Sequence, residues 1–245
     1  MNKTIISVFI VLAISSKVYC EIKFGHVGLA DKNILSIELI DGKCVYNSKD
    51  GTGQIEGATI KINELEKIEN YRIETNGNLL TPVSVGRKSV GSQFAKSGDW
   101  KFDPRFTHTI YLRISQNFKE GETYKITVKD VATGCRDRTL NLTFYSKNIR
   151  SESIHLTQIG FHPDTAKRGF LSCWAGTLGG VDFSESSKSG FEIVETSENI
   201  ENVEKSEKRG NPGKVAHKGV ITLRRKANES GDDAYKNNYQ NCDLY

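Results

Sequence analysis

Along most of the chain, apolar and polar residues alternate with the two-residue period of a β-strand that has one covered face. The alternation is clearest in residues 34–40, 108–114, 123–128 and 139–144. Glycine, asparagine and aspartate, which favour turns, separate these runs, and Asp41-Gly42 is one example. The pattern therefore predicts an all-β protein built from antiparallel strands.

Two stretches of the first half need a separate interpretation. Residues 43–46 follow the Asp41-Gly42 turn, and we expect them to return as the hairpin partner of residues 34–40. Residues 87–103 are polar and irregular in pattern, and we expect a long loop there.

This expected loop contains the candidate carbohydrate-binding residues, Trp100 and Phe102. The flat face of an aromatic ring matches the apolar face of a pyranose, so exposed rings in a polar loop suit sugar binding. The alternative is that both rings pack at the base of the loop. Trp174 ends an apolar run at residues 169–174, and we expect it to lie in the core.

The second half begins with two strands joined by a polar turn, at residues 153–174. Apolar Ile154 alternates with His155, as in a strand, and the dipeptide Pro163-Asp164 favours a turn. We expect residues 147–152 to link two modules, at residues 21–150 and 151–245. The predicted fold is thus two tandem antiparallel β-sandwiches.

The turn region also carries a resemblance to a known family. The residues concerned are Thr157-Gln158-Ile159-Gly160-Phe161-His162-Pro163-Asp164, followed by Lys167-Arg168. They resemble the opening of the immunoglobulin-like domain of glycoside hydrolase family 9 enzymes, with Thr157 in place of the usual asparagine and Phe161 in place of the usual tyrosine. A weaker likeness continues at residues 190–194 and 218–223. The resemblance implies that the second sandwich is immunoglobulin-like, and incomplete because the closing strand of that domain is missing.

The first module is similar, more faintly, to the leader module that precedes this domain in some secreted family-9-like proteins; the residues are 25–28, 108–112 and 121–126. In that family an (α/α)-barrel with the catalytic carboxylates follows, and the sequence holds no such barrel. The resemblance therefore implies a secreted, non-catalytic accessory region of a cellulase-type O-glycosyl hydrolase, whose partner is polysaccharide or the hydrolase catalytic domain. The alternative is a stand-alone extracellular carbohydrate-binding or adhesion module.

No residue set in the sequence has the spacing of a catalytic or cofactor site. An acidic pair, Asp232-Asp233, lies in an asparagine-rich tail, where carboxylates usually face water. Calcium accepts such oxygen ligands, but no further spaced ligand supports a calcium site, so we expect no cofactor. His155 and His162 flank the turn, and we interpret them as surface or structural histidines because a metal site needs a third ligand.

The first twenty residues predict export. Lys3 gives residues 1–20 a positive start, and the apolar run at 5–14 is too short to span a bilayer, as in a secretory signal peptide. Cleavage is expected after Cys20, with Ser16 as the alternative. We expect a secreted chain without membrane insertion. Removal of the two lysines of this segment lowers the net charge from +4 to +2, which argues against a nucleic-acid partner.

Four cysteines follow the signal peptide: Cys44, Cys135, Cys173 and Cys242. An even number in an exported chain predicts two disulfides. Of the three connectivities, Cys44–Cys135 and Cys173–Cys242 keep each bridge within one module, and we favour that pairing. The alternative is buried free thiols, which behave as small apolar residues.

Two asparagines, Asn141 and Asn228, begin Asn-X-Ser/Thr sequences, so both are candidate N-glycosylation sites. The alternation of residues 140–144 places Leu140 and Leu142 on the covered face of the strand, and it therefore predicts that Asn141 points outward.

Overall fold

A computed structural model describes residues 20–21, 23–57, 59–129, 131–133, 135–157, 159–195, 214–229 and 241–245. Strands dominate these residues, and the all-β, sandwich-type prediction is confirmed. Apart from short 3-10 turns, the helical structure among the described residues is a single turn, α1 (Ser184–Ser187).

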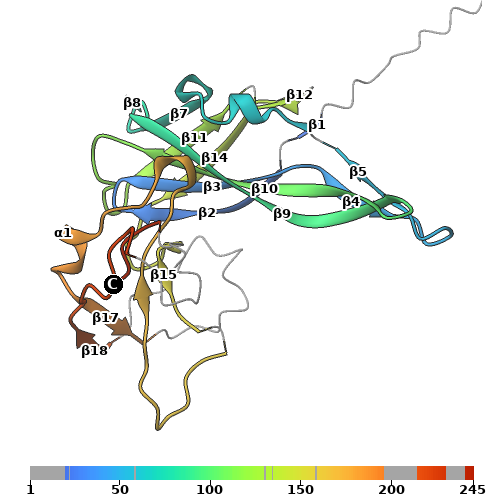
Figure 1. The fold of residues 1–245 in the computed structure, drawn as a ribbon. Helices are drawn as coiled ribbons and strands as arrows, with labels where there is room; N and C mark the ends of the chain where they lie inside the picture. Colours follow the sequence, from blue (N-terminus) through green and yellow to red (C-terminus); the bar gives the residue numbers. More distant parts are fainter. Residues whose placement is uncertain are drawn as a thin grey trace, which may run out of the picture.

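Two four-stranded antiparallel sheets form the sandwich (Figure 1). The first has the order β2-β3-β10-β9, and its strands are β2 (Lys23–Asp31), β3 (Ile34–Ile40), β9 (Ser84–Gly98) and β10 (Lys101–Arg113). The second has the order β14-β11-β7-β8, and its strands are β7 (Tyr71–Thr75), β8 (Asn78–Leu80), β11 (Thr123–Val128) and β14 (Arg138–Thr143).

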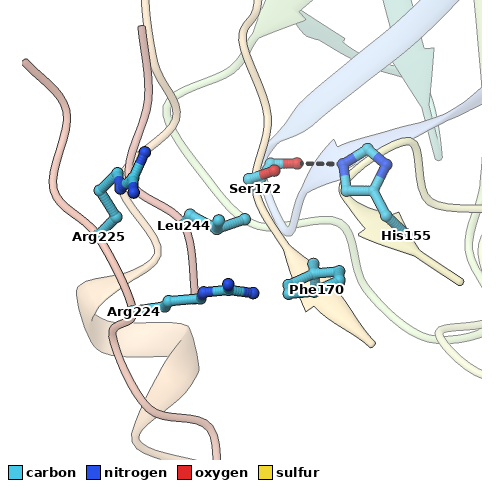
Figure 2. Close-up of a pocket in the computed structure, with 6 residues that line it drawn as sticks. All are labelled: His155, Phe170, Ser172, Arg224, Arg225 and Leu244. Carbon is cyan, nitrogen blue, oxygen red and sulfur yellow. Dashed lines mark hydrogen bonds between the residues drawn. The ribbon is translucent and has the colours of Figure 1, made fainter. Parts of the chain in front are cut away.

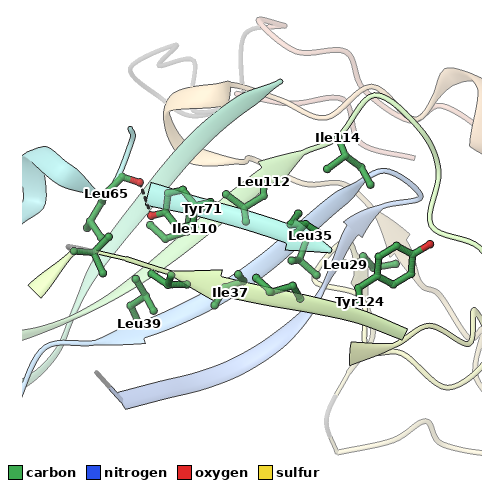
Figure 3. Packing of buried hydrophobic residues seen from close by; sticks show 14 of the residues in the cluster. Leu29, Leu35, Ile37, Leu39, Leu65, Tyr71, Ile110, Leu112, Ile114 and Tyr124 are labelled. Atoms are coloured by element: carbon green, nitrogen blue, oxygen red, sulfur yellow. Dashed lines mark hydrogen bonds between the residues drawn. The ribbon is translucent and has the colours of Figure 1, made fainter. Parts of the chain in front are cut away.

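The core lies between these two sheets (Figure 3). Ile37 of β3 stands directly opposite Ile110 of β10, and both side chains are fully buried. Directly opposed residues share one face of a sheet, so such pairs build a continuous apolar layer. Buried Tyr71 belongs to the same layer, and its hydroxyl donates a 2.7 Å hydrogen bond to the Leu65 carbonyl, which satisfies its polar atom.

The first sheet is covered on its outer face as well. Ile34 and Tyr111 face away from the sandwich core and pack in a second apolar cluster. Ala30 of β2 joins them, and the second module supplies the other buried members, Cys173, Ala175, Val181 and Phe183. Covered on both faces, β10 is buried without interruption from residue 108 to 112.

Two glycines allow the second module to approach this face closely. The turn η3 (Gly176–Leu178) lies against β9, where the Arg87 amide donates a 3.0 Å hydrogen bond to the Thr177 hydroxyl. A Cβ atom on Gly176 would stand 1.9 Å from the Arg87 carbonyl oxygen, and one on Gly86 would stand 2.4 Å from Leu178 Cγ. Only glycine fits at either position.

The expected strand, turn and return strand of the second module are present. Strand β15 (Ile154–His155) pairs antiparallel with β16 (Phe170–Leu171), and Pro163 lies in the connection between them. Leu171 in turn exchanges two 3.1 Å backbone hydrogen bonds with Tyr245. A second pair, β17 (Phe191–Val194) and β18 (Val215–Gly219), is also antiparallel.

Short elements complete the structure. These are the parallel pair β1 (Cys20–Glu21) and β13 (Cys135–Arg136), the antiparallel pair β6 (Thr59–Ile60) and β12 (Ala132–Thr133), and the 3-10 turns η1 (Ile62–Glu64) and η2 (Ile68–Asn70).

One predicted strand pairing was wrong. Strand β4 (Lys43–Tyr46) does not return along β3; it pairs with β5 (Gly53–Glu56). Both neighbours of β3 in the sheet are already taken, by β2 and β10. Gly42, with φ of 60°, redirects the chain away from the sheet, so the Asp41-Gly42 turn is real but leads to a different partner.

Candidate functional site

The candidate site is a projecting hairpin, which we call the arm: residues 91–106, the part of the β9–β10 hairpin beyond the pair Val90–Thr107, where the pairing of β10 with β3 ends (Figure 1). The long loop expected at residues 87–103 was wrong, because these residues are paired strands and only Asp99 and Trp100 connect them. These residues are polar because this part of the hairpin lies outside the sandwich and one of its faces is exposed to solvent. A polar pattern therefore does not indicate a loop here.

The arm has a covered face and an open face. Ala95 is 1% exposed because the β4–β5 hairpin packs on it, with Ala95 Cβ 3.4 Å from the Cβ position of Gly53. Successive residues of a strand point to opposite faces, so Phe94 must point to the open face. Phe94 stands opposite Pro104, and Phe102 stands opposite Lys96, so these four residues share the open face.

Three aromatic side chains of the arm are open to solvent. Trp100 at the tip is 95% exposed, Phe94 is 64% exposed and Phe102 is 53% exposed. The structure therefore brings the two predicted residues together at one end of the hairpin, and their rings do not pack at the base of a loop. The sequence pattern did not predict a role for Phe94. This residue joins the site because β9 pairs with β10, which carries Phe102.

Trp100 also has an unusual backbone conformation. Its φ of 58° lies in the left-handed region, which is normally occupied by glycine or asparagine because other side chains crowd the backbone there. A bulky tryptophan thus occupies a position at which glycine would be more stable, and the burial of its ring does not compensate for this.

The surroundings of the rings are polar and mainly cationic. Lys96 and Lys101 flank the tip, and the Lys96 ammonium lies 4.0 Å from the Asp99 carboxylate. An exposed ion pair of this kind adds little stability. Aromatic faces with nearby hydrogen-bond donors can bind the apolar face and the hydroxyls of a sugar at the same time.

Trp174, which we expected in the core, is 45% exposed, so that expectation was wrong. Its neighbours Cys173 and Ala175 point into the second apolar cluster, and alternation along the chain turns the tryptophan outward. An isolated exposed ring of this kind is common on protein surfaces.

A partly buried polar network lies at the junction between the first sheet and the second module. The Lys88 ammonium lies 2.5 Å from a carboxylate oxygen of Glu152, and the Tyr111 hydroxyl donates to the same oxygen at 2.9 Å. Burial, and next the charge of Glu152, raise the pKa of the Tyr111 phenol above its ordinary value, so this group stays a donor. We interpret the network as structural, because each charge has an internal partner.

Two histidines are shielded from solvent: His108 is buried, and His26 is partly buried. Burial lowers the pKa of His108, whose Nδ1 lies 2.8 Å from the Ser89 hydroxyl. Burial also lowers the pKa of His26, and the positive charge of Arg150 lowers it further, whereas Glu38 and Glu152 act in the opposite direction. Both histidines therefore favour the neutral form in the folded chain.

The predicted disulfides are unsupported. Cys44 and Cys173 are free thiols, so neither Cys44–Cys135 nor Cys173–Cys242 is formed in this structure. Cys44 lies on β4 beside the arm, where its sulfur is 3.9 Å from the Phe94 carbonyl oxygen, whereas Cys135 lies on β13 next to β1. Burial raises the pKa of the Cys173 thiol to about 11, which keeps it protonated at neutral pH.

The remaining candidate residues are distributed over the surface. Asn141 on β14 is exposed, as its strand pattern predicted, and Asn228 is exposed with φ of 67°. His155 donates from Nε2 to the Ser172 carbonyl at 2.9 Å, and His162 lies 3.9 Å from the Asp164 carboxylate.

Asp232, Asp233 and residues 1–19 of the signal segment lie outside the described residues. Within the part of the chain that the structure describes, no three His, Cys, Asp or Glu side chains are grouped as metal ligands. In the same part, no helix is long and apolar enough to cross a membrane.

Comparison with known proteins does not assign the chain to a family. Neither a protein-family model nor a curated protein sequence matches the chain.

Proposed function

We propose that this chain is a non-catalytic, extracellular module that binds polysaccharide through the aromatic residues of the arm. The observation that carries the proposal is Trp100, a fully exposed ring in a left-handed backbone conformation. Strained residues of this kind persist where a function requires them, because stability alone would select glycine. Sugar stacking supplies such a function, since a flat ring at the tip of a projecting hairpin is accessible to a long polymer.

Phe94 and Phe102 extend this surface along the open face of the arm. They stand diagonally across two paired strands, at the spacing of about 7–8 Å that diagonal neighbours have. A polysaccharide that lies along the hairpin can therefore contact more than one ring. The covered face, filled by the β4–β5 hairpin, keeps the arm rigid and limits the entropy lost on binding.

The proposal is tested by sedimentation of the purified chain with insoluble polysaccharides, cellulose first. We expect Trp100→Ala to lower the affinity about tenfold or more, as loss of a central aromatic contact does. Phe102→Ala and Phe94→Ala should each have a smaller effect. Tyr145→Ala is the matched control, because Tyr145 is an exposed aromatic residue outside the arm.

Equal binding by the parent chain and Trp100→Ala would contradict the proposal. So would equal losses in Trp100→Ala and Tyr145→Ala, because that result would indicate unspecific adsorption. The melting temperature of each variant separates a binding defect from a folding defect, and exposed side chains should leave it unchanged.

A second candidate function follows from the resemblance to glycoside hydrolase family 9, in which this chain is the accessory region of a cellulase-type hydrolase. It is supported by the β15–β16 pair, which encloses the resembling segment, and by the close packing of the second module on the first sheet. The partner would be a hydrolase catalytic domain. Sequencing the transcript past the codon for Tyr245 tests this role: a frame that continues into a barrel supports it, and a stop codon contradicts it.

A further inference from the structure

A pocket of about 400 Å³ lies in the second module, and none of the arm residues lines it. Its volume is within the range of about 300–1,000 Å³ that is typical of small-molecule sites. Figure 2 shows the side chains that line it: His155, Phe170, Ser172, Arg224, Arg225 and Leu244.

Backbone pairing fixes the two sides of the pocket. The Arg225 amide and carbonyl exchange hydrogen bonds of 3.1 and 2.8 Å with Leu244, and Leu171 exchanges two of 3.1 Å with Tyr245. The final residues therefore lie between the strand that carries Phe170 and the segment that carries the two arginines. The pocket is thus framed by paired backbone.

One side of the pocket is cationic. The Arg224 guanidinium lies over the Phe170 ring, with 5.5 Å between Arg224 Cζ and the ring centroid, an arrangement that orients the cation. Among the residues that the structure describes, no carboxylate forms an ion pair with Arg224, so its donor groups remain available to a ligand. Arg225 adds a second positive charge to the same side.

The opposite side is held in place by a hydrogen bond. His155 Nε2 lies 2.9 Å from the Ser172 carbonyl oxygen, and because a carbonyl only accepts, this nitrogen carries the proton. The bond fixes the imidazole beside Phe170. The pocket thus combines apolar walls, Phe170 and Leu244, with cationic donors on one side.

We propose that this pocket binds a sugar unit that carries a carboxylate, such as a uronic acid of an acidic polysaccharide. The planar guanidinium fork of arginine matches a carboxylate, with which it forms paired, charge-assisted hydrogen bonds. The apolar walls suit the C–H face of a pyranose. This site goes beyond the proposed function, because it lies apart from the arm and selects a charged ligand.

Isothermal titration of the purified full chain tests the pocket with three probes: an oligogalacturonate, a neutral oligosaccharide of the same length, and inorganic sulfate. We expect the oligogalacturonate to bind most tightly, and Arg224→Gln to weaken its binding about tenfold or more. Arg224→Lys keeps the charge but loses the planar fork, so its affinity should be intermediate.

Two control variants locate the effect. Arg72→Gln removes an exposed arginine from the second sheet of the sandwich, and it should bind the oligogalacturonate as the parent chain does. Trp100→Ala should keep the arginine-dependent binding of the oligogalacturonate, because Trp100 does not line the pocket, so the two proposals can fail separately.

Three results would overturn the pocket proposal. Unchanged binding in Arg224→Gln would place the ligand elsewhere, and equal affinity for the neutral oligosaccharide would remove the role of the carboxylate. Sulfate that binds as tightly as the oligogalacturonate would identify a general oxyanion site without sugar recognition. Because Arg224 is exposed, the variants should keep the parent melting temperature, which confirms that binding is measured on folded protein.

Discussion

At the scale of single residues, the most informative position is Trp100, because its backbone and its side chain have opposite requirements. The left-handed φ of 58° favours glycine, whereas the proposed sugar contact requires a large ring. A residue that only connected two strands would have no reason to be tryptophan. Stability and binding should therefore respond in opposite directions to one substitution.

We predict that Trp100→Gly keeps or raises the stability of the chain, by about 0.5–1 kcal/mol, while it abolishes binding to polysaccharide. Trp100→Ala removes the same ring but keeps a Cβ atom, so it should lose binding without the gain in stability. Chemical denaturation of the three proteins measures the difference. A clear loss of stability in Trp100→Gly would show that the ring packs on the protein and is not presented to a ligand.

His108 should make the stability of the chain depend on pH, because burial lowers its pKa in the folded state. As the pH falls below about 6.5, the ordinary pKa of histidine, the unfolded chain binds a proton that the folded chain resists. The free energy of unfolding should therefore decrease between pH 7 and pH 5, above the range in which carboxylates titrate. In His108→Gln, which keeps a polar group near the Ser89 hydroxyl, this decrease should be smaller.

Denaturation at half-unit pH steps checks this dependence. The pKa of His26 is lowered as well, so the double variant His26→Gln/His108→Gln should show the shallowest slope in this window. A slope that is identical in the parent and the double variant would contradict the assignment of imidazoles that stay neutral in the folded chain.

At the scale of elements, the contact between β9 and η3 depends on the absence of side chains. We predict that Gly176→Ala destabilises the chain by roughly 2–4 kcal/mol, because a Cβ atom would overlap the Arg87 carbonyl oxygen and the φ of 61° disfavours alanine. Gly121→Ala is the matched control, because Gly121 also has positive φ but nothing lies within 4 Å of its Cβ position. Equal losses in both variants would contradict the steric explanation.

The elements also show what the sequence can predict. Alternation defined β3 with the correct bounds and predicted the strands β11 and β14, because each keeps one face on the sandwich core. Alternation did not predict β9, because the outer part of this strand extends beyond the core and most of its residues are exposed on both faces. Pairing partners, such as β5 for β4, depend on contacts that local patterns do not encode.

The candidate site was predictable only in part, for the same reason. Trp100 and Phe102 stand out as aromatic residues in a polar stretch, so residue type was sufficient to select them. The role of Phe94 requires the register between β9 and β10, and the arginine pocket requires the final residues to lie beside Leu171. Both contacts join residues that are distant in the sequence, so a local pattern does not predict them.

In the molecule as a whole, the sheet β2-β3-β10-β9 contributes to both apolar clusters. Its inner face packs on the second sheet of the sandwich, and its outer face, around Ile34 and Tyr111, is covered by the second module. The apolar residues that the second module contributes to this cluster are buried against that sheet. We therefore predict that residues 21–245 unfold in a single thermal transition, because each part covers apolar surface of the other.

The same reasoning predicts the behaviour of the first module on its own. Residues 21–150 expressed alone should expose the outer face of the sheet, melt at a lower temperature than the longer chain, and bind a hydrophobic dye. Tyr111→Ala in the longer chain is the matched test, because it truncates the largest side chain on that face and should also lower the melting temperature. Two separate transitions in the longer chain, with the first module as stable alone as in the whole, would show instead that the two modules are independent folding units joined only by their linker.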